Sequence, residues 1–439
     1  MTWALGDALA WLDAHIDLEK SAAVAGKVEG LKLDNMTELC SVLADPQDQQ
    51  PTVHVTGTNG KGSVARIVTR LIGAHDLLVG TYTSPHLERV NERISRNGEP
   101  IDDAGLAAVL SDLAAIEPLL SHTPSYFELL TAAAFRWFSD EAVAAAVVEV
   151  GLLGRWDATN VVDGLVAVLT NVGRDHTDGT GDWRRRIAEE KSGIVKPGST
   201  FVLGETSPDL EPVFQSTPAR EIWRRGDDFD CAANRLAVGG RLLDLRTPGG
   251  SYDDVFLSLH GEHQGENAAV ALAAAEAFFD RALDEDLVRE ALADVDNPGR
   301  FEVVQHDPLL ILDGAHNVDG AQAAAAALEE GFTIAGARRL VVGVLEGRPV
   351  GELLEVLGVD DVAEVLCCSP DSPRALPAEA LAAEVRSRGG TARVVPDVGA
   401  ALEAALDASA DADLVLVTGS LYTVGSARAA CRRLGLLHR

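Results

Sequence analysis

Residues 57–63 of the sequence read GTNGKGS and contain the residue types that bind phosphate. They directly follow the apolar run Thr52–Thr56. A glycine-rich turn between a strand and a helix presents backbone N–H groups and the positive end of the helix dipole to an anion. Lys61 would add a compact positive charge. The segment is a variant of the GxxxxGK[ST] loop, because Val55 stands at the first glycine position and Gly62 separates Lys61 from Ser63.

Polar side chains follow four other apolar runs, at the points where strands would end. These groups are Glu149; Asn171, Asp175 and His176; Asp313, His316 and Asn317; and Ser420. In open α/β sheets, ligands bind at the carboxyl ends of the strands. An isolated glutamate is usually solvated and an isolated histidine is usually structural. Four groups at equivalent positions beside a phosphate loop instead indicate one shared site.

The oxygen donors among these residues suit Mg²⁺, which proteins hold through few side chains together with phosphates and water. Glu149 is the carboxylate candidate, and Ser63 and Ser84 supply candidate hydroxyls. His176 is a less usual magnesium ligand. Its chemistry alone leaves open whether it binds metal or acts as a base.

Short apolar runs bounded by Gly, Asp or Asn predict the strands that would position these residues. The runs are Thr52–Thr56, Val143–Val150, Leu165–Thr170, Leu309–Leu312, Leu340–Val344 and Leu414–Thr418. They are rich in valine and mostly do not alternate, which is typical of parallel strands buried on both faces. Alanine-rich segments such as Ala268–Asp280 predict helices. Strands that alternate with helices indicate an α/β fold with doubly wound, mostly parallel sheets.

The chain of 439 residues is long enough for two or three domains. The sequence Asn297-Pro298-Gly299 precedes a new strand–turn–helix unit that has its own polar residues at the strand end. We therefore expect a larger domain at residues 1–297 and a smaller one at residues 298–439. A crevice between two such domains is a common ligand site.

The net charge is −31, from 37 Lys and Arg against 68 Asp and Glu. This charge argues against binding to nucleic acid or to anionic lipid, which both require basic surface. An acid-rich chain with only six lysines is typical of adaptation to a salty cytosol, where ions screen self-repulsion. Codon bias in a GC-rich genome would also replace lysine by arginine, but it explains the acid excess less well.

The five cysteines include no CxxC pair, which predicts reduced thiols and argues against structural zinc. The first 20 residues lack a basic segment and carry Asp inside their apolar run, so no signal peptide is expected. No run of about 18 apolar residues is free of charge. We expect a cytoplasmic protein without a membrane-spanning segment.

Motifs that cover nearly the whole chain occur in one order. They are GTNGKGS (57–63), TSPHL (83–87), VNERI (90–94), SYFELLTAAAF (125–135), EVGLLGRWDATN (149–160), NVGRDHTDGTG (171–181), EKSGIVKPG (190–198), GEHQGENA (261–268), NPGRFE (297–302), LDGAHN (312–317) and TGSLYTV (418–424). Together they resemble the folylpolyglutamate synthase/dihydrofolate synthase family of the Mur ligase superfamily. The extra Gly62 favours its folate branch over the peptidoglycan branch.

This resemblance implies an ATP-dependent carboxylate–amine ligase. It also implies an N-terminal P-loop-type sheet, like the central domain of Mur ligases, and a smaller Rossmann-like C-terminal domain. The residues that match nucleotide-binding positions are Gly57, Thr58, Asn59, Gly60, Lys61, Gly62, Ser63, Asn267, Arg300 and Asp313. The residues assigned to magnesium are Ser63, Ser84, Glu149 and His176.

The resemblance also implies substrate-binding and catalytic residues. Those at the pterin-bearing substrate are Ser125, Phe127, Glu128, Leu153 and Arg155, and those at glutamate are Asp313, His316 and Ser420. Lys61, Lys191 and His316 are the catalytic candidates. Lys191 matches a lysine that the family carries as a carbamate, which helps to hold a second Mg²⁺. A monovalent cation is a further candidate cofactor.

The sequence departs from the family pattern near the pterin-binding segment. The usual GLGGR is GLLGR at residues 151–155, and Trp156 replaces a common leucine. The bulkier Leu153 and Trp156 bear on substrate preference and not on the ligase chemistry. The segment GVLEGR at residues 343–348 fits the family only loosely.

The implied reaction activates a carboxylate as an acyl phosphate, which the glutamate amine then attacks. The acceptor is dihydropteroate, a reduced folate or both, and we favour a dihydrofolate synthase or a bifunctional enzyme that acts as a monomer. One alternative is a Mur-type ligase for another acceptor, but a loop that begins at Gly57 leaves little room for a carrier-binding domain before it. The other is an ATP-binding switch, which would not need Asp313, His316 and Ser420 on a second domain.

Overall fold

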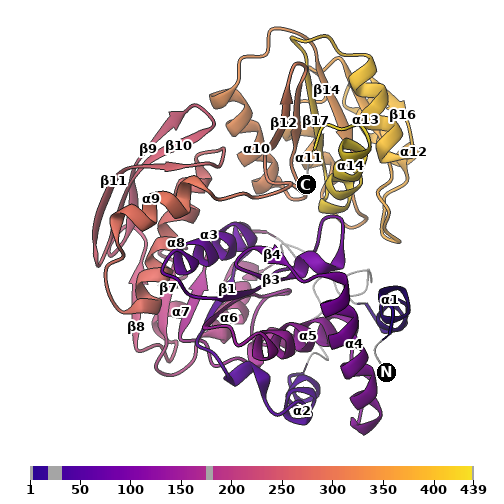
Figure 1. Ribbon diagram of the computed structural model, residues 1–439. Coiled ribbons are helices and arrows are strands. Elements are labelled where there is room, and N and C mark those ends of the chain that lie inside the picture. Colours follow the sequence, from indigo (N-terminus) through magenta and orange to yellow (C-terminus); the bar gives the residue numbers. More distant parts are fainter. Residues whose placement is uncertain (1–2, 18–31, 175–180, 438–439) are drawn as a thin grey trace.

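The computed structural model describes residues 3–17, 32–174 and 181–437. We call the described residues up to 297 the N-terminal part and those from 298 the C-terminal part. The N-terminal part contains an eight-stranded sheet and a three-stranded sheet, and the C-terminal part contains a six-stranded sheet (Figure 1).

The eight-stranded sheet has the order β4-β3-β2-β5-β1-β6-β7-β8. Its strands are β1 (Thr52–Thr56), β2 (Val79–Tyr82), β3 (Ile94–Arg96), β4 (Glu99–Pro100), β5 (Ala145–Glu149), β6 (Val166–Leu169), β7 (Thr200–Leu203) and β8 (Glu221–Arg224). The six strands from β2 to β8 in this order are parallel, and β3 and β4 add an antiparallel edge. This topology confirms the expected mostly parallel α/β fold.

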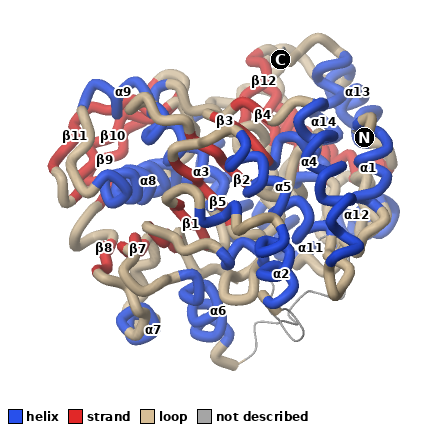
Figure 2. The backbone as a smooth tube through the Cα atoms, turned by 60° about the horizontal axis from the view of Figure 1, so that its bottom comes forward, coloured by secondary structure: helices blue, strands red, loops and turns tan. Residues whose placement is uncertain are grey.

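Helices cover both faces of this sheet, as Figure 2 shows. They are α1 (Leu5–Asp13), α2 (Asp34–Val42), α3 (Lys61–Gly73), α4 (Asp103–Ile116), α5 (Tyr126–Asp140), α6 (Trp183–Lys191), α7 (Glu211–Gln215), α8 (His263–Phe279) and α9 (Glu285–Ala293). Successive strand residues face opposite sides. Val147 packs into the core that contains α3 and α8, whereas Val148 packs into the core that contains α4 and α5. Burial on both faces explains the continuous valine-rich strands.

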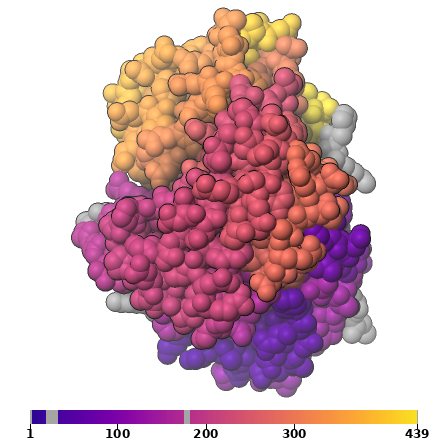
Figure 3. Space-filling model, turned by 90° about the vertical axis from the view of Figure 1, so that its left-hand side faces the viewer, coloured from indigo at the N-terminus to yellow at the C-terminus, as the bar shows by residue number. Residues whose placement is uncertain are grey.

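A three-stranded antiparallel sheet extends the N-terminal part. It consists of β9 (Asp230–Ala237), β10 (Gly240–Thr247) and β11 (Gly250–Leu257). Figure 3 shows this region, in pink, rising against the orange C-terminal part. The buried guanidinium of Arg241 bonds Glu330 of the C-terminal part at 2.5 Å, so this sheet also braces the two parts against each other.

The six-stranded sheet of the C-terminal part has the order β12-β13-β17-β14-β15-β16. Its strands are β12 (Glu302–His306), β13 (Leu309–Leu312), β14 (Arg338–Val342), β15 (Glu364–Cys367), β16 (Ala392–Val394) and β17 (Leu414–Thr418), and only β12 is antiparallel to its neighbour. Its helices are α10 (Val318–Gly331), α11 (Val350–Val356), α12 (Ala378–Ser387), α13 (Val398–Asp407) and α14 (Leu421–Arg433). The first three pack on one face of the sheet and the last two on the other.

The strand register brings the predicted site residues to common edges. Val55 of β1 pairs with Glu149 at the end of β5, and Leu312 of β13 pairs with Val417 of β17. All five cysteines are unpaired, as expected. No helix in the described ranges is both long and apolar enough to cross a bilayer.

Candidate active site

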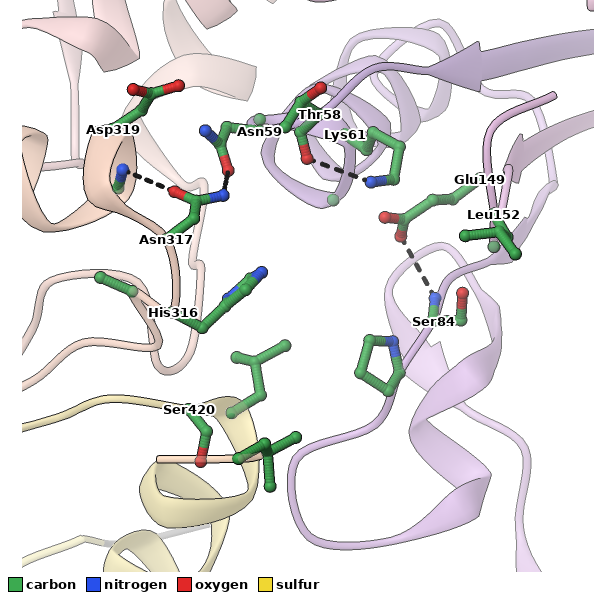
Figure 4. A pocket seen from close by; sticks show the side chains of 18 of the residues that line it. Thr58, Asn59, Lys61, Ser84, Glu149, Leu152, His316, Asn317, Asp319 and Ser420 are labelled. Atoms are coloured by element: carbon green, nitrogen blue, oxygen red, sulfur yellow. Dashed lines mark hydrogen bonds between the residues drawn. The ribbon is translucent and has the colours of Figure 1, made fainter. Parts of the chain in front are cut away.

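A cavity of about 1330 Å³ lies between the N-terminal and C-terminal parts. The loops that follow β1, β2, β5 and β6 line one side, and those that follow β13, β14 and β17 line the other (Figure 4). Single-ligand pockets measure roughly 300–1,000 Å³. This cavity therefore has room for more than one substrate at a time.

Most of the site residues predicted from the sequence line this cavity. They are Thr58, Asn59, Gly60, Lys61, Gly62, Ser63, Ser84, Ser125, Phe127, Glu128, Glu149, Asn267, Arg300, Asp313, His316 and Ser420. Gly57, Leu153, Arg155 and Lys191 are not among the lining residues. His176 lies outside the described residues.

The phosphate-binding loop of residues 57–63 runs from the end of β1 into the first turn of α3, and it requires glycine at Gly60. This residue has φ of +82°, and a Cβ there would lie 2.5 Å from Oδ1 of Asn267 on α8. Among the described side chains none caps the start of α3, so its first-turn N–H groups are available to an anion. Lys61 Nζ donates to the backbone oxygens of Gly57 at 3.2 Å and Thr58 at 3.3 Å.

Asn59, at the tip of this loop, forms hydrogen bonds with residues of both the N-terminal and the C-terminal part. Its backbone N–H donates to Oδ1 of Asn171 at 3.0 Å, and its backbone oxygen accepts from Thr170 Oγ1 at 2.6 Å. Its side-chain Oδ1 accepts from Nδ2 of Asn317, in the C-terminal part, at 3.0 Å (Figure 4). The loop is thereby joined to the turn that carries His316.

Glu149 supplies a buried carboxylate beside the loop. Its Oε2 accepts from the backbone N–H of Ser84 at 3.2 Å, and a Cβ on Gly62 would lie 3.6 Å from the same oxygen. Burial raises the pKa of Glu149, while Lys61, the Ser84 N–H and Arg300 act in the opposite direction. The carboxylate thus lies where a cation would stabilise its charge.

The donor set around Glu149 fits Mg²⁺. Ser63 is buried and its Oγ accepts from Nδ2 of Asn297 at 2.7 Å, which fixes the hydroxyl beside the loop. Within the described ranges, no group of three His, Cys, Asp or Glu side chains could enclose a metal. One carboxylate with hydroxyls is the sparse protein contribution of a magnesium ion that nucleotide phosphates and water complete.

Lys191 lies behind the loop rather than on the cavity wall. It ends α6, its side chain is buried, and Nζ donates to the backbone oxygen of Gly57 at 2.6 Å. The same oxygen accepts from Lys61, so two ammonium groups support the first residue of the loop.

The C-terminal part presents a buried carboxylate next to a guanidinium. Asp313, directly after β13, accepts from the backbone N–H groups of Phe301 at 2.8 Å and Ala315 at 2.9 Å. Burial raises the pKa of Asp313, and Arg300 opposes this shift. Burial lowers the pKa of Arg300, and Asp313 and Glu149 oppose that shift. Arg300 therefore interacts electrostatically with carboxylates of both parts.

His316 and Ser420 mark the far side of the cavity (Figure 4). Nδ1 of His316 bonds the backbone oxygen of Gly314 at 3.0 Å. Because a carbonyl only accepts, Nδ1 carries the proton of the neutral ring and Nε2 is the basic nitrogen. Ser420 caps α14, because its Oγ accepts from the backbone N–H of Thr423 at 3.0 Å.

The pterin-binding prediction divides into two groups. Ser125 and Glu128 line the cavity but bond each other's backbone N–H groups at the start of α5, at 3.3 and 2.7 Å. Phe127 lines the cavity with Leu152 and Trp156. Leu153 has φ of +58° and packs into the core under β6 and β7. Nη2 of Arg155 instead donates to the backbone of α6, at 3.1 Å.

Three arginines that sequence reasoning did not single out also line the cavity. Arg174 follows β6, Arg348 follows β14 and Arg374 follows β15. They come five, six and seven residues after the ends of these strands, so the rule that ligands gather at strand ends points to their loops but not to the individual residues.

Comparison with known proteins agrees with this architecture. Residues 55–275 match the model of the Mur ligase middle domain, and residues 299–421 match that of the Mur ligase glutamate ligase domain. The chain is 38% identical over 446 aligned positions to a dihydrofolate synthase/folylpolyglutamate synthase of Mycobacterium tuberculosis. That alignment covers 90% of this chain and 89% of the relative.

Solved structures give the same result. A Mycobacterium tuberculosis folylpolyglutamate synthase complexed with ADP superposes with a TM-score of 0.89 at 37% identity, covering 97% of this chain and 98% of that one. A bifunctional folylpolyglutamate synthase/dihydrofolate synthase with Mn, AMPPNP and L-glutamate bound has a TM-score of 0.84 at 30% identity, covering 98% of both chains. The chain belongs to the folylpolyglutamate synthase/dihydrofolate synthase family of ATP-dependent glutamate ligases.

Proposed function

We propose that this protein joins L-glutamate to the carboxylate of dihydropteroate, of a reduced folate, or of both, and that it activates this carboxylate with ATP. The observation that carries the proposal is the Asn59–Asn317 hydrogen bond of 3.0 Å. It joins a phosphate-binding loop to the turn that holds His316, across one cavity with room for several ligands. The comparisons favour this function over a ligase for another acceptor and over a non-ligating switch.

In the first step, an acceptor carboxylate oxygen attacks the γ-phosphorus of ATP, and ADP leaves with the electrons of the broken P–O bond. The N–H groups at the start of α3 bind the phosphates, and Lys61 moves from the loop carbonyls to the transferring group. Arg300 offsets negative charge from the opposite side. Such catalysis is chiefly positioning and charge neutralisation.

In the second step, the glutamate amine attacks the acyl carbon and phosphate leaves. The amine must lose a proton. We assign this role to Nε2 of His316, whose other ring nitrogen is held by Gly314. Ser420 and Asp313 line the same side and are proposed to orient glutamate.

Mg²⁺ is the metal that we propose for Glu149, Ser63 and Ser84, and it would offset phosphate charge when bound. A second ion and a monovalent cation are part of the same proposal. The Mn-bound relative supports a divalent metal in this fold.

Lys191 is proposed to carry a carbamate. Two observations support this proposal: Lys191 is buried beside the phosphate-binding loop, and it is one of only six lysines in the chain. Intact-mass measurement under native conditions with ¹³C-labelled bicarbonate tests it. A mass increase of one CO₂ in the wild type that is absent from Lys191→Ala is expected. An unmodified wild type would contradict the proposal.

The acceptor is tested with a panel of dihydropteroate, tetrahydrofolate and its polyglutamates. We expect glutamate-dependent release of phosphate with dihydropteroate, and product of increased mass in each productive reaction. Phosphate release that is independent of glutamate and acceptor would favour the switch. The Mycobacterium tuberculosis relative is named for both activities, which supports a test of both.

We further propose a cytoplasmic, salt-adapted monomer with a domain boundary near Asn297. The support is the composition together with the start of the six-stranded sheet at Glu302.

A further inference from the structure

A cluster of ion pairs outside the cavity joins the two parts of the molecule. Glu88, in the loop after β2, accepts from Nε of Arg428 at 3.0 Å and from Nε of Arg432 at 3.0 Å, both on α14. Arg428 also bonds Glu302 at the start of β12. The side chains of Arg428 and Glu88 are 9% and 14% exposed. Burial on this scale makes the pairing much less sensitive to salt than a surface ion pair.

The backbone of the loop that carries Glu88 is held by hydrogen bonds to one side chain. The carboxylate of Glu92 accepts from the backbone N–H groups of Leu87 at 2.8 Å, Glu88 at 3.0 Å and Arg89 at 2.8 Å. The same loop contains Ser84, whose N–H donates to Glu149 in the cavity. The loop thus connects the proposed metal carboxylate to the surface of the C-terminal part.

One face of α14 is shaped to receive this loop. Gly425 precedes Arg428 and Arg432 by three and seven residues, so all three lie on the same side of the helix. A Cβ on Gly425 would lie 1.9 Å from the backbone oxygen of Leu87. The first residues of α14 and its cap, Ser420, line the cavity. A shift of α14 against the loop would therefore move the glutamate side of the cavity.

We propose that Glu88 is a positioning residue for ligation. Its ion pairs with Arg428 and Arg432 hold α14 against the loop, and so set the distance between the phosphate loop and the residues that receive glutamate. The proposal rests on the ligase function proposed above. It assigns no contact with substrate to Glu88, which is not among the residues that line the cavity.

Glu88→Gln is the first test, because it removes the charge but keeps the shape, and leaves Arg428 paired with Glu302. We expect kcat to fall roughly 10- to 100-fold, as misplacement by about 1 Å typically costs. The melting temperature should stay near that of the wild type, and amide hydrogen exchange in α14 and in residues 84–92 should become faster. Glu88→Asp, which keeps the charge, should recover most of the activity.

Gly425→Ala tests the same interface without changing charge, and should lower kcat in the same way. Asp361→Asn is the matched control, because it breaks an exposed ion pair with Arg338 inside the C-terminal part and should leave kcat unchanged. Wild-type kcat in Glu88→Gln, or unchanged hydrogen exchange in α14, would overturn the proposal. A wild type that makes no glutamate-dependent product would overturn the ligase function instead, and the hydrogen-exchange comparison would still test whether Glu88 holds the two parts together.

Discussion

Among single residues, Glu149 has a pKa on which burial and neighbouring positive charges act in opposite directions. Burial disfavours its charge, while Lys61 and Arg300 favour it. We predict that Glu149→Gln abolishes metal-dependent turnover, because a neutral amide cannot replace the one buried carboxylate of the proposed magnesium site. Turnover at increasing Mg²⁺ concentration measures the effect, and ADP binding without metal is the control. Near-wild-type activity in Glu149→Gln, or in Glu149→Ala, would exclude the metal assignment.

His54 gives a prediction about stability rather than activity. It is fully buried in β1, its Nε2 lies 2.9 Å from Thr159 Oγ1, and burial lowers its pKa from 6.5 to about 3. Between pH 6.5 and 3, His54 is therefore protonated in the unfolded chain but neutral in the folded protein. The neutral ring contributes to the free energy of unfolding in full above pH 6.5. This contribution is lost as the pH falls towards 3, at about 1.4 kcal/mol per pH unit.

Urea unfolding at pH 6.5 and 5.0 measures this effect. The wild type should lose roughly 2 kcal/mol more unfolding free energy over this interval than His54→Gln, which has no titrating group there. Other groups titrate in both proteins, so only the difference between the two curves is diagnostic. Parallel curves would contradict the assignment.

At the scale of elements, the junction of β1 and α3 depends on Gly60. We predict that Gly60→Ala weakens ATP binding strongly, because its φ of +82° and the nearby Asn267 both exclude a Cβ. Gly198→Ala is the matched control. Gly198 has φ of +88° with nothing within 4 Å of its Cβ position, so it shares the backbone strain of about 1–2 kcal/mol without the contact. Calorimetric titration with ATP should distinguish the two, and equal affinities would contradict the prediction.

Strands that carry strong apolar runs were predictable from the sequence. Thr52–Thr56, Leu309–Leu312 and Leu414–Thr418 have the expected bounds, because buried parallel strands need apolar side chains on both faces. The antiparallel sheet of β9 to β11 was not predicted. Its strands carry polar residues on an exposed face, and their partners are set by hairpin geometry rather than by a continuous apolar pattern.

Side-chain direction was the less predictable part of the candidate site. Strand ends placed Glu149, Asp313 and Ser420 correctly on the cavity, because position along a parallel strand is enough to decide this. Leu153 and Arg155 occur in a tight turn, where successive residues point in unrelated directions. The motif identified the turn and Trp156, but only the backbone shows that Leu152, and not Leu153, lines the cavity with Trp156.

At the scale of the whole molecule, a charge of −31 must be screened. We predict that the melting temperature rises between 0.1 and 2 M KCl, because the Debye length falls from about 10 Å to under 3 Å and self-repulsion weakens. Thermal unfolding monitored by circular dichroism measures it. NaCl at equal ionic strength should give the same rise if screening is the cause. A melting temperature that does not change with salt would instead favour codon bias as the explanation for the low lysine content.

The cavity shared by the two parts also affects how efficiently ATP is used. The phosphate loop and His316 line this same cavity, so an activated acceptor formed beside the loop can react with glutamate without leaving the protein. Hydrolysis of that intermediate would consume ATP without yielding an amide bond. The number of amide bonds made per ATP consumed is thus governed by how long the two parts remain together. Coupling yield becomes a property of the interface, separate from the intrinsic reactivity of the groups that carry out the chemistry.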